Sequence, residues 1–109
     1  MKELEKNIKE VGKERPEVQA FLEFTGKLMA PSALDLKTKE LISVAIAVYI
    51  KCKYCIVTHV YNALKAGATE DEIMEAALVA VQFGGGPAIS HCVTLVNESI
   101  KEFAHEFEN

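Results

Sequence analysis

The segment KCKYCIVTHV, residues 51–60, holds two of the three cysteines and one of the three histidines of the chain. Cysteine pairs at this spacing form disulfides, bind metals as thiolates or exchange electrons with a substrate. On a helix that advances about 100° per residue, Cys55 lies about 60° and His59 about 20° from the direction of Cys52. The three side chains therefore project from one side, and the spacing allows a shared site.

The residues around this direction predict a sheltered site with reactive thiols. Ile56, Ala63 and Ala66 lie within about 40° of it, so the site shares the apolar face of its helix. Burial raises the pKa of a thiol, whereas a helix N-terminus and an adjacent imidazolium lower it. Because two effects oppose one, we expect reactive thiols, with His59 one turn after Cys55 and placed to accept its proton.

A carboxylate can join this site only if the chain reverses. Glu40 precedes Cys52 by twelve residues, and a continuous helix would separate the two by about 18 Å. If the chain turns near Lys51 into an antiparallel hairpin, Glu40 falls opposite residues 59–62. A carboxylate, an imidazole and two thiols would then converge. The rival interpretation is that Glu40 is an ordinary acid in the first turns of a helix, where it favours the helix dipole.

The elements that must position these residues are helices. No alternating stretch bounded by turn residues indicates a strand, so the pattern predicts an all-α fold of about six helices in a single domain, residues 1–109. The first helix should end between Gly12 and Pro16, where a second begins. The third, roughly 36–49, is apolar all round after a polar first turn, which indicates a central element enclosed by neighbours. The third helix and the fourth helix, which follows it, would together form a central helical hairpin.

The second half of the chain carries clear start and stop signals. A fourth helix should begin near Cys52 and end at KAGA, where Gly67 occupies the position that favours a left-handed residue. Thr69 and Glu72 form a capping box that opens a fifth helix. The run GGGP, residues 84–87, then separates it from a last helix.

The composition of the chain limits the classes of partner that it is expected to bind. A chain of 109 residues buries about two-thirds of its unfolded surface, yet 50% of this one is apolar, so we expect contacts between copies. Twelve basic and sixteen acidic residues give a net charge of −4 and no electrostatic reason to bind nucleic acid.

The same sequence predicts a cytoplasmic protein that does not contact a membrane. The charged N-terminal segment lacks the apolar stretch of a secretory signal. The longest apolar run, residues 41–50, is half the length of about 20 residues that a membrane span needs. Cytoplasmic thiols are kept reduced, which favours a catalytic or metal-binding pair over a permanent disulfide.

The pattern Glu-x11-Cys-x2-Cys-x3-His, formed by Glu40, Cys52, Cys55 and His59, resembles the signature of the AhpD-like alkylhydroperoxidases in the carboxymuconolactone decarboxylase superfamily. The flanking stretches LDLKTKELI, THVYNALKAGATEDEI and GGGPA are similar to that family as well. The likeness covers roughly residues 33–88, and it is much more specific than an isolated Cys-x-x-Cys.

The resemblance implies an all-helical homotrimer or homohexamer that reduces hydroperoxides without a cofactor. It assigns the attack on the peroxide to Cys55, resolution of the sulfenic acid as a disulfide to Cys52, and proton relay to Glu40 and His59. An external thiol or dithiol reductant must then regenerate the pair. AhpD itself has a histidine where this chain has Tyr54, so part of the relay is missing or replaced by the phenol.

Other interpretations compete with peroxide reduction. The decarboxylase branch of the superfamily lacks the cysteine pair in its motif, so lactone decarboxylation is the weaker enzymatic alternative. A non-enzymatic assembly module would keep the two thiols inert or bind zinc through both of them and His59, with His91 or Cys92 as a fourth ligand. Because His91 and Cys92 are adjacent, they point in different directions and clamp a metal poorly. We expect them to be a hydrogen-bonded core histidine and a small buried thiol.

Overall fold

The computed structural model describes residues 2–108, which divide after Asp35 into two compact units. All regular elements in this part of the chain are helices, so the all-α prediction is confirmed. The first unit contains α1 (Lys2–Glu14) and α2 (Pro16–Met29). Between them Arg15 is extended, with φ −123° and ψ 106°, because a residue before proline is pushed out of the helical region. Gly12 does not end α1; it is buried inside the helix.

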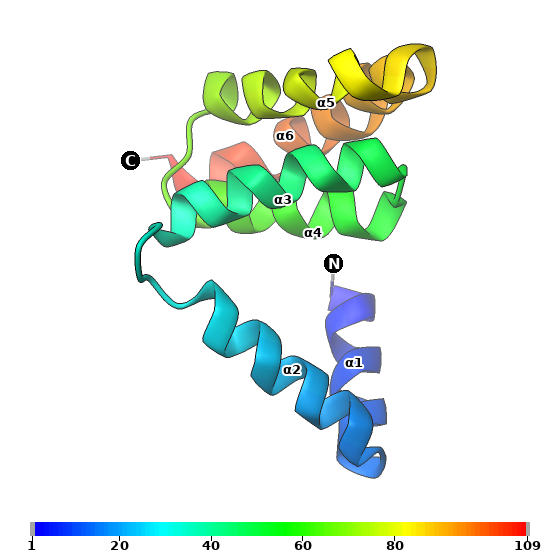
Figure 1. Ribbon diagram of the computed structural model, residues 1–109, viewed down its shortest axis with the longest axis vertical. Helices are drawn as coiled ribbons and strands as arrows, with labels where there is room; N and C mark the ends of the chain where they lie inside the picture. The colour runs from blue at the N-terminus through cyan, green and yellow to red at the C-terminus, as the bar shows by residue number, and fades with distance from the viewer. Residues whose placement is uncertain (1, 109) are drawn as a thin grey trace. The chain divides into compact units, whose positions relative to one another are not determined.

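The second unit begins with α3 (Leu36–Ile50) and α4 (Lys53–Lys65). It continues with α5 (Glu70–His91), a π-helical turn (Cys92–Val96), α6 (Asn97–Phe103) and a short 3-10 turn (Ala104–Phe107). Figure 1 shows α3 lying between α4 and α5, and it packs against both. The predicted central hairpin is therefore the α3–α4 pair.

A two-residue turn reverses the chain between α3 and α4. The backbone N–H of Lys51 donates to the carbonyl of Val48 at 3.2 Å, and that of Cys52 donates to the carbonyl of Ala47 at 3.1 Å. Lys51 itself has a φ of 59°. These bonds satisfy the last carbonyls of α3 as a left-handed helix end does, and they deliver Cys52 to the start of α4.

The capping box that the sequence predicts is present at the start of α5. The hydroxyl of Thr69 accepts from the N–H of Glu72 at 3.0 Å, and the carboxylate of Glu72 accepts from the N–H of Thr69 at 2.9 Å. Lys37 in the first turn of α3 donates to the same carboxylate at 3.1 Å. The Thr69 N–H and then Lys37 lower the pKa of Glu72 below its ordinary value. The box thus joins the starts of α3 and α5.

The GGGP run bends α5. Gly85 has φ 65° and ψ −144° inside the helical run, so the predicted separation is a kink at one residue and the chain is helical on both sides of it. Only glycine adopts this conformation without strain. Gly67, at the end of α4, likewise has a positive φ of 96°, as its position in KAGA predicts.

Replacing Gly85 by alanine should lower the free energy of unfolding by about 1–3 kcal/mol, because a Cβ strains the left-handed backbone. Gly86→Ala is the matched control: its added Cβ would meet nothing within 4 Å, and its φ is not positive. Urea unfolding of both variants measures the difference. Equal stability of the two would contradict a kink that depends on Gly85.

The core of the second unit joins four of its elements. The largest fully buried side chains come from α3, α4, α5 and the π-helical turn: Ile56, Ile73, Val44, Val48, Val60, Val96 and Cys92. The prediction that α3 is enclosed all round is wrong within this chain. Its buried residues are Glu40, Val44, Ala47 and Val48, whereas Ile42, Ile46, Tyr49 and Ile50 are exposed. Its neighbours α4 and α5 cover only part of its circumference.

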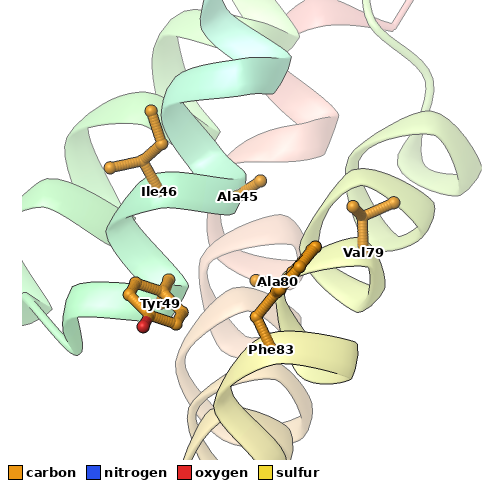
Figure 2. A pocket seen from close by; sticks show the side chains of 6 residues that line it. All are labelled: Ala45, Ile46, Tyr49, Val79, Ala80 and Phe83. Atoms are coloured by element: carbon orange, nitrogen blue, oxygen red, sulfur yellow. The ribbon is translucent and has the colours of Figure 1, made fainter.

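An apolar groove of about 310 Å³ runs along this exposed side of α3. Figure 2 shows how α3 and α5 line it, with Ala45, Ile46 and Tyr49 on one side and Val79, Ala80 and Phe83 on the other. The Phe83 side chain is 72% exposed. Contiguous apolar surface of this kind marks interaction sites, and contact between copies of the chain stays a prediction.

By length and composition alone, the helical run Glu70–Phe107 could cross a membrane. Core helices satisfy the same criteria, and this run contributes the fully buried Ile73 and Val96 to the second unit. It also bends at Gly85. A single run of this kind is weak evidence for a span, and the absence of membrane contact stays a prediction.

Candidate active site

Glu40 and His59 face each other across the hairpin. Glu40 in α3 is 4% exposed, and its Oε1 lies 2.7 Å from Nδ1 of His59 in α4. This contact agrees with the count from the turn, which put Glu40 opposite residues 59–62. Because a carboxylate accepts, Nδ1 is the donor, and the hydrogen bond fixes the orientation and tautomer of the ring. The Nε2 atom is left to exchange a proton.

Cys52 and Cys55 form a disulfide at the start of α4. Cys52 is the N-cap, with φ −95° and ψ 106°, and its sulfur accepts a hydrogen bond from the N–H of Cys55 at 3.2 Å. Both cysteines are half-buried, as is His59, in line with the expected sheltered site. Helical counting therefore applies to Cys55 and His59 but not to Cys52, which reaches Cys55 from an extended backbone.

A pocket of about 140 Å³ opens beside Cys55. The hairpin builds it from both helices: α4 contributes Cys55 and His59, and α3 contributes Ser43, Ile46, Ala47 and Ile50. Cys55 is the only cysteine among these lining residues. A small molecule in this pocket would therefore lie beside Cys55 and His59, with largely apolar walls around it.

The α3 wall of this thiol pocket was not predicted from the sequence. Ser43, Ala47 and Ile50 follow Glu40 at intervals of three and four residues, so they share its side of the helix. Once Glu40 is opposite His59, the same interval places them beside the site. This spacing is visible in the sequence, but the sequence of α3 is apolar on all sides after its first turn and does not indicate which side faces the site.

Three other residues that the sequence singled out lie apart from this pocket. Cys92 is fully buried, and its thiol contacts the Met74 sulfur at 3.4 Å, which confirms the expected buried thiol. His91 is half-buried, and its Nδ1 lies 2.9 Å from the carbonyl oxygen of Pro87. Tyr54 is 69% exposed and does not line the pocket.

The zinc interpretation lacks a ligand cluster in the described residues. Between residues 2 and 108, no group of three or more His, Cys, Asp or Glu side chains is arranged to hold a metal. The sulfurs of Cys52 and Cys55 are bonded to each other, and a disulfide has no thiolate to give a metal. His91 and Cys92 have the partners described above and do not join the pair.

Burial raises the pKa of the Cys92 thiol, so less of it is thiolate at neutral pH. In the reduced native protein, iodoacetamide should therefore modify Cys52 and Cys55 first, and Cys92 only after unfolding in urea. Mass spectrometry should find two adducts per chain before unfolding and three afterwards, since the chain has three cysteines. Rapid addition of three would show that the third thiol is accessible in the native fold.

The sequence is similar to known proteins along most of its length. The profile of the Carboxymuconolactone decarboxylase family matches residues 16–98. A Paracoccus denitrificans protein named "Uncharacterized protein 4 in cox locus" is 44% identical over 72 residues, which are 66% of this chain and 65% of that protein. The match thus spans just under two-thirds of that relative. A Cupriavidus necator protein is 32% identical over 88 residues, 78% of this chain and 76% of its own.

Solved structures share the fold. An apo carboxymuconolactone decarboxylase family protein from Legionella pneumophila has a TM-score of 0.86 and 35% identity, covering 94% of this chain and 92% of its own. A family protein from Thermotoga maritima, for which a role in the antioxidative response has been suggested, has a TM-score of 0.71 and 28% identity over 84% of this chain and 97% of its own. The chain belongs to the carboxymuconolactone decarboxylase family.

Proposed function

We propose that this protein is a dithiol-dependent peroxidase that reduces hydroperoxides with Cys55 as the nucleophile. One observation carries the proposal: Cys55 lines a pocket together with His59, whose ring is held by the buried carboxylate of Glu40. Cys52 is close enough to close a disulfide with Cys55. A nucleophile, a proton carrier and a second thiol are the parts that thiol-based peroxide reduction needs.

The first step is attack by the Cys55 thiolate on the terminal oxygen of the hydroperoxide. The sulfur lone pair forms the S–O bond while the O–O bond breaks, and its electron pair leaves with the alkoxide. The Nε2 atom of His59, which has taken up the proton of the Cys55 thiol, gives that proton to the alkoxide. The products are an alcohol and the sulfenic acid of Cys55. Glu40 is a positioning residue in this scheme, because it acts through the imidazole that it orients.

The second step joins the two sulfurs. The Cys52 thiolate attacks the sulfur of the Cys55 sulfenic acid, and the S–S bond forms while the S–O bond breaks. The hydroxide that leaves takes up a proton from solvent and becomes water. The N–H of Cys55 that donates to the Cys52 sulfur is placed to stabilise negative charge on it. An external thiol or dithiol reductant then supplies two electrons and restores the reduced pair.

The proposal includes an assembly of several copies, a homotrimer or homohexamer, in the cytoplasm. It is supported by the apolar groove along α3 and α5 and by the exposed Ile42 and Ile50 on α3. Covering this surface would remove apolar area from water at about 25 cal/mol per Å². Size-exclusion chromatography with light scattering measures the number of copies.

Thiol counting tests the peroxidase proposal. Fully reduced protein has three thiols per chain, and one equivalent of tert-butyl hydroperoxide should leave one, the buried Cys92. The lost pair should return on addition of dithiothreitol.

Metal content, which tests the alternative functions, is measured on protein purified without chelator. Stoichiometric zinc, together with thiols that do not react with peroxide, would instead support a structural module. Lactone decarboxylation that persists in the Cys55→Ser variant would support the decarboxylase alternative.

A further inference from the structure

Ser43 is the one hydroxyl residue in the thiol pocket. Its side chain is half-buried and lines the pocket with Cys55 and His59, while the other α3 lining residues, Ile46, Ala47 and Ile50, are aliphatic. It lies three residues after Glu40 on the same side of α3. The peroxidase scheme above gives Ser43 no part, although it is the one α3 residue with a polar side chain among those that line the pocket.

The hydrogen bond of Ser43 determines what this atom can offer. Its Oγ lies 2.8 Å from the backbone carbonyl oxygen of Lys39, one turn earlier in α3. A carbonyl oxygen only accepts, so the hydroxyl hydrogen of Ser43 is donated to it. A serine hydroxyl has one donor and two acceptor lone pairs. The oxygen of Ser43 therefore keeps acceptor lone pairs, with its donor already engaged.

A hydroperoxide brings the complementary group. It carries one O–H donor, which is hydrogen-bonded in water and loses that partner on entering a pocket with aliphatic walls. Leaving such a group unpaired costs about 1–3 kcal/mol. In the proposed reaction the Cys55 thiolate engages the terminal oxygen and His59 serves the leaving oxygen, so neither accepts this hydrogen.

We infer that Ser43 is a substrate-binding residue whose Oγ accepts the O–H hydrogen of the hydroperoxide. The inference rests on the proposed function and deepens it. During the reaction this hydrogen stays on the terminal oxygen, which moves from the O–O bond to the Cys55 sulfur and becomes the sulfenic acid. The proton taken up by the alkoxide comes from His59. Ser43 thus holds the same O–H group before and after transfer, and it favours oxidants that carry one.

Two oxidants separate this role from a structural one. In a Cys52→Ser background, the loss of the Cys55 thiol is followed by peptide mass spectrometry with tert-butyl hydroperoxide, and separately with methyl methanethiosulfonate, which has no O–H or N–H group. Ser43→Ala should slow the reaction with the hydroperoxide about 5- to 10-fold, as expected for one lost hydrogen bond. It should leave the reaction with the thiosulfonate unchanged. Alanine is a better helix former than serine, so the variant should fold.

Two further variants control the result. Ser43→Thr keeps a hydroxyl that can bond to the carbonyl one turn earlier, and it should restore the hydroperoxide rate to within about two-fold. Ser90→Ala removes the same kind of bond elsewhere: the Ser90 hydroxyl donates to the Gly86 carbonyl at 3.1 Å in α5, and Ser90 does not line the thiol pocket. It should change neither rate.

The failures are distinguishable. If Ser43→Ala reacts with the hydroperoxide as fast as the parent, or slows with both reagents alike, the inference is overturned while the peroxidase proposal stands. If the parent reacts with the thiosulfonate but not with the hydroperoxide, the peroxidase proposal itself fails, and the role of Ser43 fails with it. Slowing confined to the hydroperoxide, with rescue by threonine, supports the inference.

Discussion

Cys55→Ser should abolish hydroperoxide consumption, and Cys52→Ser should stop it after one turnover. A serine hydroxyl stays protonated at neutral pH and cannot replace the thiolate as nucleophile. The first variant therefore has no group to attack the peroxide. The second keeps Cys55 in its pocket beside His59 but removes the partner of the disulfide. It should consume one equivalent of peroxide per chain and then accumulate the sulfenic acid.

Dimedone trapping with mass spectrometry separates these two outcomes. A single adduct on the peptide containing Cys55 is expected in Cys52→Ser, and none on the peptide containing Cys52 in Cys55→Ser. Cys92→Ser is the matched control, because Cys92 is buried away from the pair and its loss should leave turnover intact. An adduct on Cys52 in the Cys55→Ser variant would mean that Cys52 attacks the peroxide and Cys55 resolves the sulfenic acid.

His59→Ala should affect both rate and stability. Removal of a group that transfers protons in a reaction lowers the rate by about 10²–10⁴-fold. Oxidation of Cys55 by hydroperoxide should therefore slow by about 100-fold or more. The same substitution leaves the buried Glu40 carboxylate without the ring nitrogen that lies 2.7 Å from it. A lost hydrogen bond to a charged group should lower the free energy of unfolding by about 1.5–3 kcal/mol.

Glu40→Gln distinguishes orientation of the ring from charge beside it. The amide oxygen can still accept from Nδ1 of His59, so the ring keeps its orientation, and the stability loss should be smaller than in His59→Ala. His105→Ala serves as the control, because His105 is exposed in the last 3-10 turn and does not line the pocket. Urea unfolding and rapid-mixing kinetics are measured on all three. An oxidation rate in His59→Ala equal to that of the His105 control would remove His59 from the mechanism.

Local signals in the sequence predicted the elements that position the site. The capping box at Thr69 and Glu72 depends on groups three residues apart. The GGGP run was expected to separate two helices, and in the structure it is a kink at Gly85 within α5. The contact between Glu40 and His59 followed from counting equally from the turn, because an antiparallel helix pair preserves that register. Their roles in catalysis, like those of the two cysteines, remain predictions.

Features that depend on tertiary packing were not readable in the same way. A helix that is apolar on every side does not indicate which side its own chain will cover, so neither the exposed side of α3 nor the Ser43 wall of the pocket was predicted. Helical counting placed Cys52 on the helix, but an N-cap has an extended backbone. At Gly12 the sequence suggested an end to α1, yet the steric effect of Pro16 sets that end at Glu14.

The side chain of Ile46 lines both the apolar groove and the thiol pocket. If an occupant of the groove restricts the rotamers of this isoleucine, it also changes the shape of one wall beside Cys55. The two sites are then thermodynamically linked: a molecule that fills the pocket alters affinity at the groove by the same factor as the reverse. If copies of the chain cover the groove, dilution will change the specific activity of the protein as well as its mass in solution.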